Sequence, residues 1–302
     1  MARKTDEQIL ADLGTAPDGR LARDVNLWTL EKLATLQLYL KAFATACQSV
    51  GGGIFVDGLA GPGMCRVQDA VFPPEFVHGS SLIALQTRPM LERCLSIEKG
   101  PNEAKVLRER SAPFGERAIV KQGDVNSDLV PLIEKYVGGA PCFCLLDPEG
   151  SELDWSTIAA LASIGRRSRK IELFILFPLE MGTVRLFPLK KNLDPASREV
   201  ATRTFGGDEW EVVYRARRDG LGAPEAKARY LNLYQDKLRR LGYKHVREKP
   251  IKAPSKPGGS RRTHYHLIFA TDHPVGDEIM EDIFERPYIL QFPVTGQRGL
   301  GI

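Results

Sequence analysis

Four acidic side chains each follow a short apolar segment of this chain, at the point where a strand would end. They are Asp57, Glu98, Asp124 and Asp147. The carboxyl ends of parallel strands lie along one edge of a sheet, and open α/β folds bind their ligands there. Carboxylates accept hydrogen bonds from hydroxyl and amino groups. The spacing therefore predicts one polar ligand site that several strands build together.

A glycine-rich turn follows the first of these acids, at Gly58, Gly61 and Gly63 with Ala60 between them. Glycine lets the backbone turn tightly and approach a ligand closely, as in nucleotide-type pockets. We therefore expect Asp57 and these four residues to bind a cofactor. The alternative is a tight turn without a ligand, and the further acids at strand ends favour the cofactor.

The elements that must position these residues follow from the alternation of apolar runs with segments of helical periodicity. Strands separated by helices indicate a parallel sheet with right-handed crossovers. Strands are predicted at 54–57, 93–98, 118–122, 142–146 and 171–177, and helices at 28–49, from about 80, and at 101–110, 127–136 and 155–164.

The pattern changes after the fifth strand. We expect an insertion of irregular or helical character at 178–222, followed by a helix at 224–241 with a basic side. Two antiparallel strands are predicted at about 242–249 and 263–270, joined by a mobile basic loop at 250–262. The predicted fold class is therefore α/β, with a seven-stranded, mostly parallel sheet and a late antiparallel strand pair.

Length and composition are those of an ordinary globular protein. The chain has 302 residues, 43% of them hydrophobic and 26% charged. We expect one domain over 1–302, with an N-terminal segment at 1–27 that is loosely attached over 1–24. No run approaches the ~18 apolar residues of a membrane span. The first ten residues lack the apolar core of a signal peptide, so we expect a cytoplasmic protein without membrane contact.

Positive charge gathers in one part of the chain. Residues 201–262 hold 16 Lys and Arg against 7 Asp and Glu. Such asymmetry suggests a polyanionic partner such as nucleic acid, and a solvated basic surface is the alternative. Within this stretch we expect Lys252, Lys256, Arg261 and Arg262 to contact phosphates.

Cysteine and tryptophan have simpler expected roles. The five cysteines contain no Cys-x-x-Cys pair, so we expect buried, reduced thiols and no metal site. Trp28, Trp155 and Trp210 are expected to anchor packing.

The chain resembles the three-Cys-motif partner (TcmP) family, within the Rossmann-like S-adenosylmethionine-dependent methyltransferases. The resemblance covers most of residues 28–285, and its motifs together are more specific than any one of them. They are Asp57-Gly58-Leu59-Ala60-Gly61-Pro62-Gly63, Gly79-Ser80-Ser81, Ile97-Glu98, Gly123-Asp124, Leu146-Asp147-Pro148-Glu149-Gly150, the helix Lys32–Leu40 and the turn Gly207–Trp210.

This resemblance implies a methyltransferase fold, S-adenosylmethionine as cofactor, and a companion protein that carries the three cysteines of the family's name. It implies that Glu98 binds the ribose, Asp124 the adenine, and Asp147 with Pro148 the methyl acceptor. The Asp147-Pro148 pair also resembles the Asp-Pro-Pro-Tyr motif of enzymes that methylate the adenine amine. Glu149 and Gly150 replace the second proline and the aromatic residue here, so the stacking group of that motif is missing.

We therefore predict an S-adenosylmethionine-dependent methyltransferase that acts with a partner protein on nucleic acid. A protein or peptide acceptor delivered by the partner stays open. The alternative is a catalytically silent adaptor that keeps the fold and binds a partner protein or nucleic acid. An NAD-dependent dehydrogenase is a weaker interpretation, because the gap from Asp57 to Glu98 is about twice the ~20 residues of the dinucleotide fingerprint.

Overall fold

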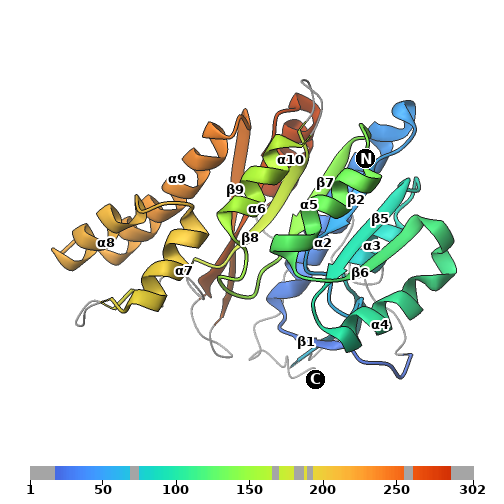
Figure 1. The fold of residues 1–302 in the computed structure, drawn as a ribbon, viewed down its shortest axis with the longest axis horizontal. Helices are drawn as coiled ribbons and strands as arrows, with labels where there is room; N and C mark the ends of the chain where they lie inside the picture. Colours follow the sequence, from blue (N-terminus) through green and yellow to red (C-terminus); the bar gives the residue numbers. More distant parts are fainter. Residues whose placement is uncertain are drawn as a thin grey trace, which may run out of the picture.

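One sheet of seven strands runs through the molecule in the order β6-β5-β2-β7-β8-β10-β9 (Figure 1). The computed structural model describes residues 18–68, 75–164, 170–179, 187–188, 193–254 and 261–286. β10 is antiparallel to both of its neighbours, and the other six strands run in one direction. This arrangement confirms the predicted α/β fold with a seven-stranded, mostly parallel sheet and a late antiparallel strand pair. The strands are β2 (Ile54–Asp57), β5 (Arg93–Glu98), β6 (Ala118–Gln122), β7 (Cys142–Leu146), β8 (Glu172–Phe177), β9 (His245–Pro254) and β10 (Arg261–Thr271).

Helices cover both faces of this sheet. The side chains of β2 show why two cores form: Phe55 faces one core, whereas Ile54 and Val56 face the other, as the period of two in a strand requires. The first core is shared with α2 (Trp28–Cys47), α3 (Ser80–Gln86) and α10 (Pro274–Glu285), and the second with α5 (Val125–Tyr136), α6 (Trp155–Ser163) and α9 (Ala223–Arg240). α4 (Pro101–Ser111) lies beside β6, and two short 3-10 helices span Gln48–Val50 and Ala112–Arg117.

The hairpin of β9 and β10 is longer than the sequence predicts. Pairing continues to Arg261 opposite Pro254, so the predicted mobile loop at 250–262 is wrong at both of its ends. The middle of that loop, 255–260, lies outside the described residues. Burial explains the extension, because Ile251 is fully buried opposite Tyr265. β9 is an edge strand, where a proline's missing N–H costs little.

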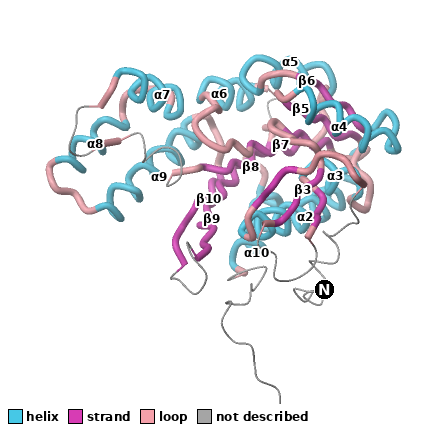
Figure 2. The backbone as a smooth tube through the Cα atoms, turned by 90° about the horizontal axis from the view of Figure 1, so that it is seen from below, coloured by secondary structure: helices cyan, strands magenta, loops and turns pink. Residues whose placement is uncertain are grey.

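The described part of the insertion after β8 contains two helices, in line with the predicted irregular or helical character. α7 (Pro195–Phe205) starts with a proline at its first turn and with Asp194 as its cap, whose side chain accepts a hydrogen bond from the Ser197 N–H. α8 (Trp210–Arg218) follows, and Trp210 is fully buried with its ring stacked 5.0 Å from that of Phe187. Figures 1 and 2 show α7, α8 and α9 together at one end of the molecule.

A second, three-stranded sheet lies beside the first, and the sequence pattern did not indicate it. It joins β1 (Arg23–Val25), β3 (Met64–Val67) and β4 (Phe76–His78) in the order β1-β3-β4. β1 runs parallel to β3, so the segment before α2 is part of the fold. Residues 18–24 are therefore fastened, which corrects the expectation of loose attachment, and residues 1–17 lie outside the described part.

A buried arginine on α4 fastens this segment. The Arg110 guanidinium donates to both carboxylate oxygens of Asp18 at 2.8 Å, and to the carbonyl oxygens of Leu21 and Pro62 at 2.7 and 2.6 Å. The hydrogen bond from Arg110 holds the pKa of Asp18 well below its usual range. Residues 18–25 are thereby held against the loop that follows β2.

Candidate functional site

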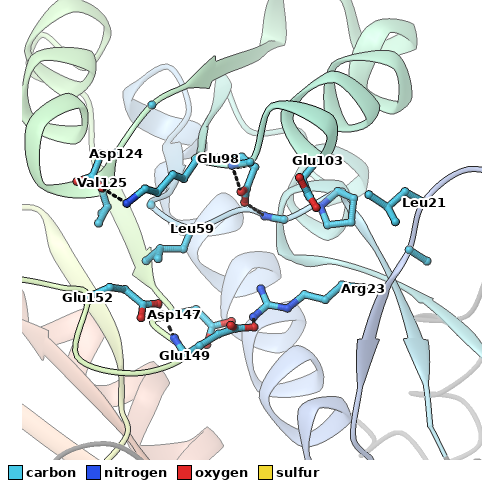
Figure 3. Close-up of a pocket in the computed structure, with 17 residues that line it drawn as sticks. Leu21, Arg23, Leu59, Glu98, Glu103, Asp124, Val125, Asp147, Glu149 and Glu152 are labelled. Carbon is cyan, nitrogen blue, oxygen red and sulfur yellow. Dashed lines mark hydrogen bonds and ion pairs between the residues drawn. The ribbon is translucent and has the colours of Figure 1, made fainter.

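A cavity of about 620 Å³ opens at the carboxyl ends of the parallel strands (Figure 3). Its walls are the loop after β2, the ends of β5, β6 and β7, and the segment at 21–23. The sequence-predicted residues Gly58, Gly61, Glu98, Asp124 and Asp147 all line it. The predicted polar site is therefore formed by four strand ends.

The glycine turn shapes one wall of this cavity. Gly61 has a φ of +62°, and the space that a side chain there would enter is open except for Arg23 atoms at 3.9 Å. Gly63 has a φ of +83°, and a Cβ there would lie 2.8 Å from a Leu107 methyl carbon. Gly61 therefore leaves room for a ligand at the backbone, whereas Gly63 is needed for packing against α4. Ala60 is buried in the turn and does not line this larger cavity.

Glu98 ends β5 and ties two turns together. One carboxylate oxygen accepts a hydrogen bond from the Gly61 N–H at 2.7 Å, and the other accepts one from the Gly100 N–H at 2.7 Å. A carboxylate offers about four lone-pair positions. The group therefore keeps acceptor capacity for the hydroxyls of a ligand in the cavity.

Asp124 caps α5 and also faces the cavity. Its carboxylate accepts a hydrogen bond from the Asn126 N–H at 2.9 Å and forms an ion pair with Lys99 at 3.0 Å. The hydrogen bond from Asn126 and the Lys99 ammonium lower the pKa of Asp124, so it is ionised at neutral pH. The same residue thus starts a helix and presents an acceptor to the cavity.

Asp57 occupies a different place from the one the sequence predicts. It is fully buried behind the turn, where it accepts hydrogen bonds from the hydroxyls of Ser80 at 2.5 Å and Ser81 at 2.9 Å, and it does not line the cavity. Burial raises its pKa to about 6, although the hydroxyls oppose this. Asp57 holds the start of α3 against β2 and thereby supports the turn from behind.

A second cavity of about 330 Å³ meets the first at Asp147. Asp147 forms an ion pair with Lys32 of α2, and Arg23 forms one with Glu149. Figure 3 shows Arg23 reaching across the first cavity toward Glu149 and Asp147. Pro148 lines the second cavity. The two cavities are therefore adjoining chambers with two ion pairs between them.

Aromatic side chains line the second chamber. Trp28 of α2 is half-buried, and one face of its ring stacks at 4.4 Å on His264. The Tyr265 hydroxyl donates to the Trp28 carbonyl oxygen at 3.1 Å. Both Trp28 and Tyr265 line this chamber. Trp28 thus packs as predicted and also borders a cavity, which the sequence did not indicate.

The basic hairpin extends beyond the edge of the sheet at which the chambers open. β10 pairs with β8 up to His266 opposite Phe177, the last residue of β8. Residues 261–265 therefore continue past the carboxyl end of β8, and Figure 2 shows the hairpin leaving the body of the molecule. Lys252 pairs in register with Thr263, and Arg262 is exposed. Of the other two predicted residues, Arg261 is described only by its backbone, and Lys256 lies outside the described residues.

Much of the positive charge at 201–262 is paired. Among these pairs are Arg247 with Asp277 and Glu281, Lys249 with Glu31, Lys237 with Glu209, Arg215 with Glu211 and Arg229 with Glu225. The acids paired with Arg215, Arg229 and Lys237 are already counted in the net charge of this stretch, whereas Arg247 and Lys249 are paired with acids from outside it.

Within the described residues, no group of three His, Cys, Asp or Glu is placed to hold a metal ion. Cys47, Cys94, Cys142 and Cys144 are buried free thiols, as expected. No helix in the described ranges is long and apolar enough to cross a membrane. The important residues that sequence reasoning missed are Arg23 and Lys32, both of which lie before the first large strand and far in sequence from their partners.

No family model and no curated protein matches this chain. Among solved structures, it is similar to a Legionella pneumophila protein at 13% identity and a TM-score of 0.46, over 84% of this chain and 92% of the other. It is similar to the O-methyltransferase from Bacillus cereus in complex with SAH at 14% identity and a TM-score of 0.42, over 88% and 89%. Trm1 from Pyrococcus horikoshii with S-adenosyl-L-methionine gives 11% identity and a TM-score of 0.41, over 82% of this chain and 58% of Trm1. At such low identity and TM-score, the function has to be argued from this chain's own residues.

Proposed function

We propose that this protein is an S-adenosylmethionine-dependent methyltransferase. The observation that carries the proposal is the larger cavity, where the open turn at Gly61 faces acidic strand ends at Glu98, Asp124 and Asp147. A nucleoside with an amino acid attached has hydroxyls, an amine and a compact charged end, which these groups complement.

The charge of the cavity supports a cationic ligand. Six acidic residues line it, against the two basic residues Arg23 and Lys99 among those described. The acids are Glu98, Glu103, Asp124, Asp147, Glu149 and Glu152. A concave surface dominated by one sign of charge concentrates ligands of the opposite sign. The sulfonium and ammonium groups of S-adenosylmethionine provide two positive charges against one carboxylate.

Each predicted contact has a place in this proposal. Glu98 accepts hydrogen bonds from the ribose hydroxyls, and Asp124 accepts one from the adenine amine. Gly58 and Gly61, which line the larger cavity, surround the methionine part, and Gly63 packs the turn against α4. The reactive methyl group is supplied by the cofactor, and the chain's task is to align an acceptor with it and to exclude water.

Asp147 lines both chambers and Pro148 lines the second, and we assign both residues to the acceptor. The Asp147 carboxylate orients the nucleophile or accepts its proton, which requires Lys32 to share or release this carboxylate. The second chamber then receives the acceptor group between Trp28 and Tyr265.

The acceptor we propose is nucleic acid, presented with the help of a three-Cys-motif partner protein. The extension of the basic hairpin past β8 supports this, because it places Arg262 on the side where the chambers open. A base of the nucleic acid would enter the second chamber while the phosphates contact the hairpin. If the protein, assayed with the partner present, methylated a protein and did not methylate RNA, the acceptor assignment would be wrong.

Calorimetric titration with S-adenosylmethionine and S-adenosylhomocysteine tests the cofactor. We expect micromolar dissociation constants and at least a tenfold loss in Glu98→Gln, which removes a charged acceptor of hydrogen bonds. The matched control is Glu134→Gln, the same change at an exposed position on α5. Absence of binding by the folded wild type, or an unchanged Glu98→Gln, would refute the proposal.

A catalytically silent adaptor is the second candidate. The ion pair of Lys32 with Asp147 favours it, since the group expected to serve the acceptor already has a partner. Radiolabel transfer from S-adenosylmethionine to RNA or protein, with and without the partner protein, separates the two. Cofactor binding without any transfer would support the adaptor.

A further inference from the structure

Arg23 holds a position between the two chambers. It lies in β1 opposite Cys65 of β3, and its side chain lines both cavities. Its side chain approaches to within 3.9 Å of the place where a side chain at Gly61 would begin. It is therefore the cation that stands nearest the open part of the glycine turn among the described residues of the larger cavity.

The backbone of Arg23 is fixed, whereas its ion pair is exposed. Residues 18–25 are held in place by the β1–β3 pairing and by the Arg110 clamp, which is the set of hydrogen bonds from Arg110 to Asp18, Leu21 and Pro62. The partner, Glu149, has a side chain that is 72% exposed, and that of Arg23 is 34% exposed. Ion pairs in contact with water contribute little, because the solvent screens them. The guanidinium can therefore exchange Glu149 for another carboxylate while the strand stays in place.

A carboxylate entering this cavity needs such a partner. Lys99, the other cation of the cavity wall, has no atom within 4 Å of the space at Gly61, and it pairs with Asp124. The remaining charged groups of the wall are acidic and would repel a carboxylate. A guanidinium matches a carboxylate with two parallel hydrogen bonds, which is the strongest arrangement available to either group.

We propose that Arg23 binds the α-carboxylate of S-adenosylmethionine and releases Glu149 when it does so. This assignment rests on the proposed function and adds a cofactor-binding residue outside the strand-end motifs. Glu149 lines both chambers. When cofactor binding releases Glu149 from Arg23, its carboxylate therefore becomes available at the boundary with the acceptor chamber.

The test compares two ligands that differ in the amino acid part. S-adenosylhomocysteine carries the α-carboxylate, and 5′-methylthioadenosine keeps the adenosine and the sulfur without it. We expect Arg23→Gln to weaken the binding of S-adenosylhomocysteine roughly 10- to 100-fold, as for loss of a charge-assisted hydrogen-bond pair. Binding of 5′-methylthioadenosine should change by less than about twofold. An equal loss for both ligands, or no loss for either, would overturn the assignment.

A second pair of variants tests the exchange of partners. Glu149→Gln and Glu103→Gln each remove one negative charge from the same cavity wall, but only the first removes the partner of Arg23. We expect Glu149→Gln to bind S-adenosylhomocysteine several-fold more tightly than Glu103→Gln does. Equal affinities would refute the exchange. Failure of the wild type to bind S-adenosylhomocysteine at all would instead refute the proposed function, and the Arg23 assignment with it.

Discussion

At the scale of single residues, the acids at the strand ends separate into two roles. Glu98, Asp124 and Asp147 line the larger cavity, whereas Asp57 is buried beneath it. The sequence could place all four at one edge of a sheet, since this follows from strand direction alone. It could not tell which would face a ligand, because that depends on the hydroxyls of Ser80 and Ser81 from α3.

The ion-pair partner of Asp147, the proposed catalytic residue, could not be predicted from the sequence for a similar reason. Lys32 and Asp147 are 115 residues apart, and Lys32 lies among the buried, mostly apolar residues of α2. A buried lysine in such a helix is unusual unless it is paired.

Asp147→Asn should reduce methyl transfer at least 100-fold while the dissociation constant of S-adenosylhomocysteine changes by less than about fivefold, as for loss of a proton acceptor in catalysis. Transfer from radiolabelled S-adenosylmethionine to total RNA, with the partner protein present, measures this. The control is Asp236→Asn, an exposed acid on α9. Equal rates in the two variants would remove Asp147 from the mechanism.

The buried Glu172 gives a prediction for pH. The Tyr39 hydroxyl donates to it at 2.6 Å and the Thr271 hydroxyl at 2.9 Å, yet burial raises its pKa to about 7. Because the pKa of Glu172 is higher in the folded protein than in the unfolded chain, its carboxyl group stabilises the fold fully below pH 4.5. This stability is lost as the pH rises through 7. Relative to wild type, Glu172→Gln should therefore gain about 2–3 kcal/mol in unfolding free energy between pH 5 and pH 8.

Urea unfolding at the two pH values checks this, with Glu134→Gln as the exposed control. A stability difference between wild type and Glu172→Gln that is the same at pH 5 and pH 8 would show that Glu172 does not titrate in this range.

At the scale of elements, the large sheet was predictable and the small one was not. The predicted strand 142–146 coincides with β7, because a run of buried apolar residues ends there at a charged turn. β1 is only three residues long, Arg-Asp-Val, with no apolar alternation. Such a strand exists because β3 and the Arg110 clamp hold it, so tertiary contacts determine it. The longer β9 likewise depends on β10 as its partner.

The Arg110 clamp predicts a local effect on the cavity wall. Arg110→Leu leaves Asp18 and two carbonyl oxygens without their donor, so we expect a loss of about 3 kcal/mol in stability. Hydrogen exchange at residues 18–25 should rise more than in β7, and S-adenosylhomocysteine should bind more weakly. The control is Arg108→Leu, an exposed arginine on the same helix. Unchanged exchange at 18–25 would contradict the clamp.

At the scale of the whole molecule, charge is distributed differently from the count along the sequence. Several of the basic residues at 201–262 are paired with acids, among them Arg215 and Arg247, and the hairpin carries Arg262 beyond the sheet. Sequence composition could indicate a polyanion partner, but it could not say which part of the basic stretch stays available, since that depends on packing.

Removal of charge from the hairpin should therefore weaken nucleic-acid binding more than removal elsewhere. The double variant Lys252→Ser, Arg262→Ser should reduce the salt dependence of binding to single-stranded RNA by about 0.7 for each phosphate that the hairpin no longer neutralises. Fluorescence anisotropy of a labelled oligonucleotide at several salt concentrations measures the slope. Lys105→Ser on α4 is the exposed control. The same slope in the hairpin variant and the control would exclude the hairpin from the interface.

The position of β10 between β8 and β9 also fixes the order in which a growing chain can complete its two chambers. The described walls of the larger one come from residues 21–152, so a ribosome-bound chain has them all before its second half is made. The smaller one needs Tyr265 against Trp28, and β9 cannot join the sheet until β10 has been synthesised. Contacts this distant in sequence form late. During synthesis, the walls of the larger chamber are therefore complete before those of the smaller one, so the proposed cofactor pocket precedes the proposed acceptor pocket.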